Sequence, residues 1–529
     1  MELFWSDEII GILVKNTNEY AKKQRVEQAL HSRPWRPVKP DEIWVFIGIL
    51  ITMGAYRCKT PADIWRTGKQ ARVQLYAHGW SKPISKAMSN NRFFQIKRYL
   101  HISSPDLDTS GSKWWHKLEP INSKMQEACQ KYYLPSSHIT VDEMMIRFGG
   151  RSRHTTRMPN KPITEGYKVF AICDHGYTLN WRFHSSSSGI SDLSSFYKEI
   201  ISISASTVAI VYQLVEQTLP YRTHDFTVFT DNLFSTPDLF AKLRSMGVGA
   251  CGTSRVQKGR YPDYCISPEL MPWNAVFGGQ VTGTNGAVLA AEWQDNSQVH
   301  MLTTVHNLHD RVTRNRKRPR LTSTNGPLIR SVFGDQHTMA APIPHMIDDY
   351  NLHKGGVDIA DQYRCYFFTQ LIARRNWLPF FFWLLDITVV NSFFLFRSLR
   401  EQEGDLPIQK QRFLHKDFRL TLAGLIFQLY AAGRKRGRQR WYSRRTDRVI
   451  YSKTYGVKGL LPAPHGPPGC HTRVKEEKKK ECDRCRLRLR AEGRKGKRAP
   501  LSSFSCSFCL YRLCLKCFSD YHLESGIMI

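Results

Sequence analysis

Acidic residues are scarce in this chain of 529 residues, where 45 aspartates and glutamates stand against 77 lysines and arginines. The net charge of +32 indicates a polyanionic partner, with nucleic acid as the first candidate and an anionic membrane surface as the second. We also expect no secretory leader, because residues 1–8 carry acids where a signal peptide has a basic segment. We therefore expect a reducing compartment and, with a nucleic-acid partner, the nucleus.

The sequence has no uninterrupted apolar run long enough to cross a membrane. Its nearest candidate, residues 378–396, contains Asp386 and Asn391. Since a charge at the centre of a bilayer is costly, we predict a buried core helix there and no membrane partner. The content of 41% hydrophobic and 12% aromatic residues excludes a disordered chain and allows two or three globular domains.

Cysteines are sparse before residue 470, with six scattered singly, but seven lie between Cys470 and Cys517. In a reducing compartment such a group binds metal more often than it forms disulfides. Three Cys-x-x-Cys pairs have zinc-ligand spacing, and two histidines would complete eight ligands for two Zn²⁺ ions, with Cys470 as an alternative to the first histidine. The spacing leaves open which pairs share an ion. The candidate ligands are Cys482, Cys485, Cys506, Cys509, Cys514, Cys517, His471 and His522.

Hydrophobic periodicity changes along the chain. Residues 4–133 have apolar residues at helical spacing, whereas three apolar-rich runs from residue 139 onwards are typical of strands. Strands, helices and turn residues then alternate in the order of a ribonuclease H-like fold, where acids on the first and fourth strands lie side by side. The expected strands and helices are strands 139–148, 166–173 and 177–184, helix 207–219, a strand ending at Asp231, helix 235–247 and strand 248–253.

We therefore expect an α/β fold: a ribonuclease H-like core with an α-helical N-terminal domain, a β-rich insertion and a small zinc-binding C-terminal domain. In the insertion, residues 277–291 and 299–305 resemble strands, and 309–320 forms a basic loop that is either a solvated charge run or a contact for import factors or DNA. The expected parts are an α-helical dimerisation or DNA-binding domain (1–135), the first part of the core (136–256), the insertion (257–345), the end of the core with its following helices (346–431), a basic linker (432–469) and the Cys-rich domain (470–529).

Aspartates occupy three positions that suit a metal-dependent nuclease. Asp142 lies on the first expected strand, Asp231 closes the fourth, and Asp358 follows a flexible Gly-Gly at the start of an expected helix, with Asp361 one turn further on. Phosphodiester cleavage uses two divalent ions about 3.5–4 Å apart, and carboxylate oxygens are the ligands that Mg²⁺ or Mn²⁺ prefers. Glu143 competes with Asp142, but strand alternation predicts that it faces the opposite side.

Several stretches together resemble the piggyBac family of transposases over nearly the whole chain. Their order is much more specific than any one of them. The matching stretches are 88–93, 98–101, 141–151, 160–162 (Asn-Lys-Pro), 166–168 (Gly-Tyr-Lys), 230–234 (Thr-Asp-Asn-Leu-Phe), 252–255, 350–351, 354–358 (Lys-Gly-Gly-Val-Asp), 361–362, 375–379 (Arg-Asn-Trp-Leu-Pro) and the Cys-rich end.

The resemblance implies a DDD transposase that cuts transposon ends, forms hairpins on them and joins them at TTAA targets. It implies that Asp142, Asp231 and Asp358 are catalytic metal ligands and that Asp361 is a further acid of the site. It also implies a homodimer acting on double-stranded DNA, with the zinc domain binding the terminal inverted repeats. Cations within or beside the matching stretches and the cysteine pairs are the candidate DNA contacts: Arg147, Arg151, Lys168, Lys354, Arg374, Arg375, Lys495, Lys497 and Arg498.

Two other functions compete with this one. The first is a domesticated, transposase-derived protein that binds DNA or chromatin without transposition, and the three retained acids argue against it. The second is a ubiquitin ligase built on a RING-like tail, which leaves the same three acids unexplained. Inverted repeats ending in TTAA beside the gene would discriminate between them.

Overall fold

The computed structural model of the chain divides into two compact units, Met1–Arg436 and Gly437–Ile529. Each unit is described by itself. The structure describes residues 1–26, 34–66, 84–106, 113–159, 161–185, 206–220, 225–323, 326–402, 414–431, 473–491, 499–506, 513–514 and 516–518.

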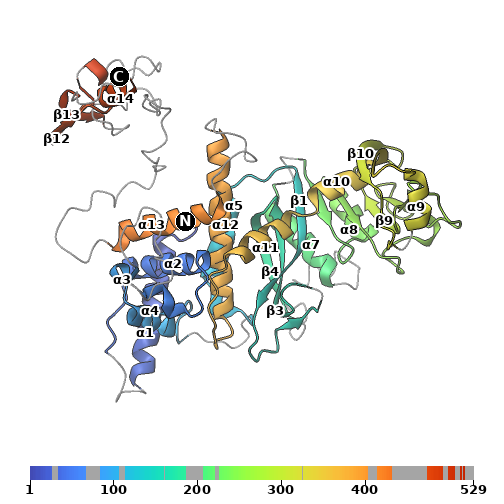
Figure 1. Cartoon of the computed structure of the whole chain (residues 1–529). Coiled ribbons are helices and arrows are strands. Elements are labelled where there is room, and N and C mark those ends of the chain that lie inside the picture. The colour runs from blue at the N-terminus through green and yellow to red at the C-terminus, as the bar shows by residue number, and fades with distance from the viewer. Residues whose placement is uncertain are drawn as a thin grey trace. The chain divides into compact units, whose positions relative to one another are not determined.

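Helices make up the first part of unit 1, in blue in Figure 1. α2 begins with a proline followed by Asp41 and Glu42, which suits the positive end of the helix dipole, and its remaining residues are almost all buried. Ser89 caps α4 by accepting a hydrogen bond from the Arg92 N–H, which separates α4 from the short α3 before it. The elements are α1 (Asp7–Val26), α2 (Pro40–Ala55), η1 (Pro61–Trp65), α3 (Ile84–Ala87), α4 (Asn90–Tyr99), η3 (His116–Leu118) and α5 (Ile121–Lys131).

A nine-stranded sheet follows, with β1 at the point where its strand directions change. β1 pairs antiparallel with β3 and parallel with β5, and β5 pairs parallel with β6. The strand order is β2-β3-β1-β5-β6-β9-β8-β7, with β4 paired to β3. The predicted strands and helices of this region are all present: β1 (His138–Arg147), β3 (Glu165–Asp174), β4 (Tyr177–His184), α7 (Ser206–Thr218), β5 (Thr227–Thr230), α8 (Pro237–Ser245) and β6 (Gly249–Thr253), with β2 (Thr156–Arg157) in addition.

Two expectations for residues 257–345 were wrong in detail. The single strand expected over 277–291 is a hairpin, because residues between β7 and β8 turn back through Gly283 and Gly286 with positive φ. The expected basic loop is largely strand β10, whose backbone pairs with β11 while most of its polar side chains stay exposed. The elements are η4 (Asp263–Cys265), β7 (Val276–Gln280), β8 (Leu289–Gln294), β9 (Gln298–Thr303), β10 (Arg311–Lys317), α9 (Gly326–Phe333) and β11 (Thr338–Pro344).

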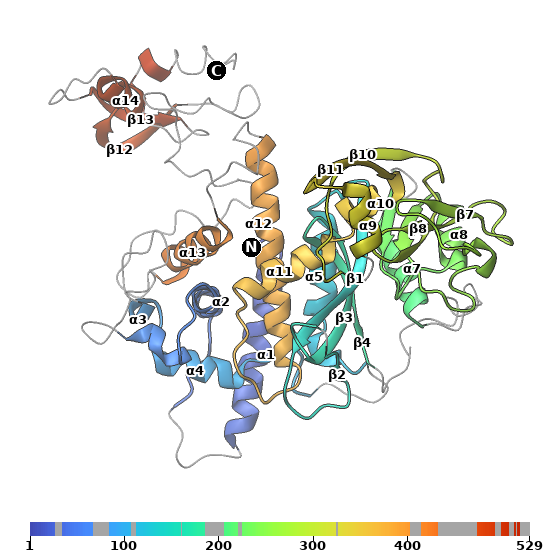
Figure 2. The same ribbon diagram turned by 45° about the vertical axis from the view of Figure 1, so that its right-hand side comes forward.

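Helices close unit 1, and α12 stands beside the sheet and the N-terminal helices in both views (Figures 1 and 2). Residues 378–400 have the length and hydropathy of a membrane span, yet 89% of the most apolar window is buried inside the protein. Asp386 in this helix accepts the backbone N–H of Thr369 and faces Arg419, which satisfies its charge within the core. The helices are α10 (His345–His353), α11 (Gly356–Tyr366), α12 (Leu378–Gln402), α13 (His415–Ile426) and the π-helical turn η6 (Phe427–Ala431).

The described part of unit 2 is a small hairpin with one helix. β12 pairs antiparallel with β13, and a cluster of Cys482, Leu513, Cys517 and Phe518 is its described apolar core. So small a core supplies little folding free energy, and a bound metal ion would supply much of what this unit needs to fold. The elements are β12 (Arg473–Glu481), α14 (Asp483–Ala491) and β13 (Leu501–Cys506).

Candidate functional site

Three carboxylates meet where the parallel pairing of β1 and β5 ends. The last pair of that ladder is Val141 with Thr230, so Asp142 and Asp231 are the next residues along two adjacent strands. The ends of parallel neighbours lie at one edge, which is why the sequence order brings these acids together. One oxygen from each of Asp142, Glu143 and Asp231 lies within 4.8 Å of the other two.

Glu143 was expected to face away from Asp142, and the structure corrects that expectation. β5 ends at Thr230, and in the described part of the chain its pairing with β1 stops at Val141. The Glu143 side chain is therefore able to reach the edge where Asp142 and Asp231 lie. Strand alternation fixes the direction of the Cα–Cβ bond but not the end of a longer, flexible side chain.

Burial and mutual repulsion disfavour the ionised forms of Asp142 and Asp231 in this carboxylate cluster. Burial first, and then the nearby carboxylates of Glu143 and Asp231, raise the pKa of Asp142 to about 8. Burial also raises the pKa of Asp231. Single backbone N–H groups, of Glu143 to Asp142 at 2.7 Å and of Leu233 to Asp231 at 2.8 Å, stabilise the ionised forms only in part. A hard divalent cation fits this set of donors, because it would remove the repulsion that holds the protons on.

Lys161 is a cation beside the acids, and the sequence interpretation gave it no role. Its ammonium lies 3.2 Å from the Glu143 carboxylate. Burial alone would lower the pKa of Lys161, but Glu143 and Asp142, with a smaller effect of Asp358, raise it. The residue belongs to the Asn-Lys-Pro stretch that matches the piggyBac family, and this match was the only signal that could have marked it.

Asp358 lies in the first turn of α11, as the Gly-Gly-Val-Asp pattern predicted. The helix approaches β1 closely because Gly356 has no side chain: a Cβ there would lie 2.7 Å from the Thr140 hydroxyl. Among the residues that the structure describes, Asp358 is exposed and does not join the 4.8 Å group, although it shares the field of Lys161. Its described link to the site is therefore its electrostatic effect on Lys161, exerted from a second element.

Asp361 has a different environment from the other acids. Its Oδ1 accepts hydrogen bonds from Nε and Nη2 of buried Arg364, at 2.9 and 2.6 Å. The same guanidinium donates to the Met145 carbonyl of β1 at 2.9 Å. Asp361 is therefore already neutralised by a cation, and the prediction that it binds Mg²⁺ has to compete with this ion pair.

The candidate DNA contacts separate into three groups. Arg147, Arg151, Lys354 and Arg374 are exposed. Two others differ from the prediction that they face DNA: Lys168 is buried, 3.8 Å from Glu143, and Arg375 donates to the carbonyls of Lys97 and Leu100 at the end of α4. Carbonyls at a helix end lack intrahelical partners, so Arg375 has a capping role. Lys495, Lys497 and Arg498 lie outside the described residues.

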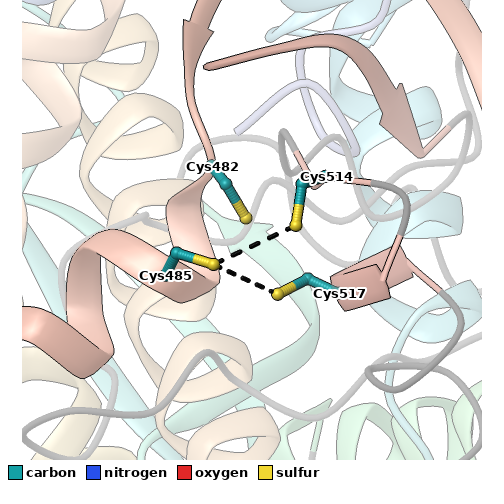
Figure 3. A group of neighbouring side chains, drawn as sticks. All are labelled: Cys482, Cys485, Cys514 and Cys517. Atoms are coloured by element: carbon teal, nitrogen blue, oxygen red, sulfur yellow. Dashed lines mark hydrogen bonds between the residues drawn. The ribbon is translucent and has the colours of Figure 1, made fainter. Parts of the chain in front are cut away.

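Four cysteines converge in unit 2. Cys482 precedes α14, Cys485 lies in its first turn, and Cys514 and Cys517 come from the last described segment, so that all four sulfurs point toward one another (Figure 3). The sulfur of Cys485 is 3.4 Å from that of Cys517 and 4.0 Å from that of Cys514. A tetrahedral zinc with Zn–S bonds of about 2.3 Å keeps its sulfurs about 3.8 Å apart, so the four thiols fit this ion.

The structure thereby answers which cysteine pairs can share an ion. The first and third pairs along the sequence form one site, with the second pair lying between them in the chain. Cys506 is the last residue of β13, and the ligands expected for a second zinc, Cys509, His522 and either His471 or Cys470, lie outside the described residues. Their pairing stays a prediction.

Comparisons with known proteins agree on one family. The family model described as Transposase IS4 matches residues 1–393. The human PiggyBac transposable element-derived protein 3 is 24% identical over 99% of this chain and 76% of its own length. The human PiggyBac transposable element-derived protein 2 is 23% identical over 75% of this chain and 60% of its own length.

A solved structure has the same mixed α/β fold. It is the cryo-EM structure of a piggyBac transposase synaptic complex with hairpin DNA, with a TM-score of 0.62 and 20% sequence identity, covering 82% of this chain and 80% of that one. Proteins of this family are in general metal-dependent nucleases and strand transferases. The family model, the two human relatives and the shared fold lead to one conclusion: the chain belongs to the Transposase IS4 family, as a member of its piggyBac type.

Proposed function

We propose that this protein is a metal-dependent DNA transposase that cleaves and joins transposon ends at TTAA targets. The observation that carries the proposal is the meeting of Asp142, Glu143 and Asp231 at one sheet edge, with Asp358 close enough to act on the charge of Lys161. Structural proteins have no need for three carboxylates held so close together, since such a cluster costs stability unless a cation binds it.

The strand order supports a ribonuclease H-like core. β4, β3 and β1 form an antiparallel set, and β5 and β6 continue it in parallel, with α7 between β4 and β5 and α8 between β5 and β6. In this arrangement Asp142 and Asp231 come from adjacent strands and Asp358 from a helix packed on β1. The DDD triad of the proposal is therefore Asp142, Asp231 and Asp358, with Asp361 as a positioning acid rather than a first choice of ligand.

The carboxylates and the cations of the proposed site have different roles. Asp142, Asp231 and Asp358 would hold Mg²⁺ or Mn²⁺, which when bound activates a water or 3′-hydroxyl and stabilises the leaving oxygen. Glu143 holds the Lys161 ammonium at the edge of the site, where it is able to contact a phosphate oxygen of the bound strand. The exposed cations Arg147, Arg151 and Lys354 lie on the same elements or their adjoining loops and would bind the DNA backbone.

The remaining parts suit recognition of transposon ends. The basic composition supports binding of double-stranded DNA, and the solved relative is a synaptic complex with hairpin DNA. The four-cysteine site supports a zinc-stabilised tail that reads the terminal inverted repeats, with a second zinc bound by the other predicted ligands. Action as a homodimer in the nucleus completes the proposal.

A second candidate function keeps the fold without the reaction. Both human relatives are named as transposable element-derived proteins, which favours a domesticated protein that binds DNA or chromatin. Retention of all three aspartates favours the enzyme.

Nicking of a supercoiled plasmid with TTAA sites separates the two functions. The full chain is expected to bind the plasmid in a gel-shift assay and to nick it in Mg²⁺ or Mn²⁺, but not in EDTA. Binding without nicking in either metal would support the domesticated protein, and nicking that persists in EDTA would contradict the metal-dependent mechanism.

A further inference from the structure

A second cluster of metal-ligating side chains lies at the start of β1, away from the carboxylates already described. His138 is the first residue of β1, and Asp349 and His353 lie four residues apart on α10, which places them on one face of the helix. One ligand atom from each of the three lies within 4.8 Å of the other two. His138 precedes Asp142 by four residues, about 13 Å along an extended strand, so the two clusters are separate sites.

Hydrogen bonds orient the ring of His353 toward Asp349. Asp174, buried at the end of β3, lies 2.8 Å from Nδ1 of His175 and therefore holds a proton on that nitrogen. Nε2 of His175 lies 3.3 Å from Nδ1 of His353. In a neutral His175 this Nε2 accepts the Nδ1 proton of His353, which leaves the lone pair of His353 on Nε2.

That lone pair faces an anion. Nε2 of His353 lies 3.4 Å from Oδ1 of Asp349. The other oxygen of Asp349 is held by Nε2 of His306 at 3.1 Å, and Nδ1 of His306 lies 2.8 Å from the Thr303 hydroxyl. A lone pair opposite a carboxylate oxygen needs a cation between them, either a proton or a metal ion. Carboxylate–histidine chains of this kind orient the ligands of many metal sites.

We propose that His138, Asp349 and His353 bind one transition-metal ion of the Zn²⁺ class. Two imidazoles and a carboxylate select zinc, cobalt or nickel over magnesium, and three protein ligands leave a fourth position for water. The ring of His138 now stacks on that of His353, with centroids 3.9 Å apart and planes 8° apart. Binding requires His138 to turn about its Cβ–Cγ bond, a soft torsion, so that its nitrogen points at the same ion.

Such an ion would fix the segment that carries Asp358. The His353 carbonyl already accepts a hydrogen bond from the Thr140 hydroxyl at 2.8 Å, and Asp358 follows His353 by five residues. A metal joining α10 to the start of β1 would hold the beginning of α11 against the sheet. The inference concerns metal binding and does not depend on the proposed nuclease activity.

Metal content of the full chain tests the proposal. After loading with Zn²⁺ and dialysis at neutral pH, the wild type is expected to hold one zinc ion per chain more than His353→Gln or Asp349→Asn, while the four-cysteine site keeps its ion in all three. The exposed His337, in the turn before β11, supplies the matched control, and His337→Gln is expected to keep the wild-type content. Circular dichroism checks that each variant is folded, and His138→Gln replaces any variant that is not.

Cobalt separates the two kinds of site. Co²⁺ bound by histidine and aspartate lacks the sulfur-to-metal absorption that the four cysteines produce, and only the sulfur-free component is expected to disappear in Asp349→Asn. His175→Gln removes the hydrogen-bond partner of His353. This substitution is expected to lower the affinity of the sulfur-free site for Co²⁺ about 10- to 100-fold. Equal metal content in the wild type, His353→Gln and His138→Gln would overturn the proposal and leave a proton-bridged hydrogen-bond chain. An equal loss in His337→Gln would overturn it as well.

Discussion

At the scale of single residues, nearby lysines offset part of the repulsion among the acids of the proposed active site. Asp142, Glu143 and Asp231 converge within 4.8 Å, and Lys161 lies 3.2 Å from Glu143, with the buried Lys168 at 3.8 Å from the same carboxylate. We expect two tasks for the Lys161 ammonium: it would stabilise the carboxylates before a divalent ion binds, and it would offer a positive charge to the DNA strand afterwards.

Lys161→Met is expected to lower the rate of plasmid nicking by about 10²-fold, the usual cost of one lost electrostatic contact in a transition state. DNA affinity should change little, because the positive charge of the whole chain supplies most of the non-specific binding. The rate at saturating DNA, compared with the affinity from gel shifts, checks this division. Lys258→Met, at an exposed position outside the cluster, is the control. A variant that loses affinity but keeps its maximal rate would show that Lys161 only binds DNA.

At the scale of elements, α11 depends on one buried ion pair for its position. Arg364 is 3% exposed, pairs with Asp361 one turn earlier and donates to the Met145 carbonyl of β1. The ion pair lies within the helix that carries Asp358, and the hydrogen bond to Met145 holds this helix against the sheet.

Arg364→Met is expected to destabilise the protein by about 1–3 kcal/mol, because the Met145 carbonyl and part of Asp361 lose their partner. Nicking should fall further than stability alone explains, since Asp358 shifts with its helix. The double variant Arg364→Met with Asp361→Asn removes the unpaired charge and should recover stability but not activity. Thermal unfolding and nicking rates measured on the same samples check both parts, and full recovery of activity in the double variant would contradict the positioning role.

The contact of α12 with α13 adds a dependence on pH. Burial, with a smaller effect of Arg419, lowers the pKa of His415 to about 2, and Nε2 of His415 accepts a hydrogen bond from Arg419 at 3.0 Å. An unfolded histidine titrates near 6.5, so below that pH the unfolded chain binds a proton that the folded chain does not. His415 therefore costs about 2 kcal/mol of stability between pH 7 and pH 5.

His415→Gln keeps an acceptor for Arg419 and removes this titration. Its unfolding free energy is expected to fall less than that of the wild type as the pH drops from 7 to 5. Denaturant unfolding at several pH values measures the difference between the two slopes, and parallel slopes would contradict the assignment of a neutral His415.

The sequence predicts elements well where periodicity and turn residues agree, as in β1, β4 and α8. The prediction of a basic loop at residues 309–320 is wrong, because the run of basic side chains gives no sign that the backbone pairs with β11. Asp142, Asp231 and Asp358 follow from their positions at strand ends and a helix start. Glu143 and Lys161 do not, since their place depends on where β5 ends and how the loop before β3 folds. The sharing of one site by the first and third cysteine pairs likewise needs three-dimensional information.

At the scale of the whole molecule, the chain separates the unit that carries the proposed nuclease site from a small cysteine-rich unit. The first unit ends at Arg436, and the described cysteine site lies wholly in the second. The first unit has a large core of its own, whereas the described core of the second is small. Loss of the zinc is therefore expected to unfold only the second unit.

Cys482→Ser combined with Cys485→Ser is expected to remove the zinc of this site and the preference for terminal repeats, while non-specific plasmid nicking continues. The comparison uses repeats found beside the gene against scrambled DNA at several salt concentrations, since base contacts rather than phosphate contacts carry the preference. Cys58→Ser, which changes a cysteine of the first unit, is the control. Unchanged preference in the double variant would contradict the assignment of end recognition to the tail.

The central claim is that the acids at the end of β1 and β5, with Asp358, form a cation-dependent nuclease site. Plasmid nicking in Mn²⁺ by the full chain with Asp142→Asn, Asp231→Asn or Asp358→Asn tests it most directly. Each substitution preserves shape and removes one negative charge, so each is expected to abolish nicking while gel shifts show unchanged DNA binding. Asp348→Asn on α10, whose carboxylate pairs with Arg314, is the matched control and should nick at the wild-type rate. Nicking at the wild-type rate by any one of the three variants would contradict the account.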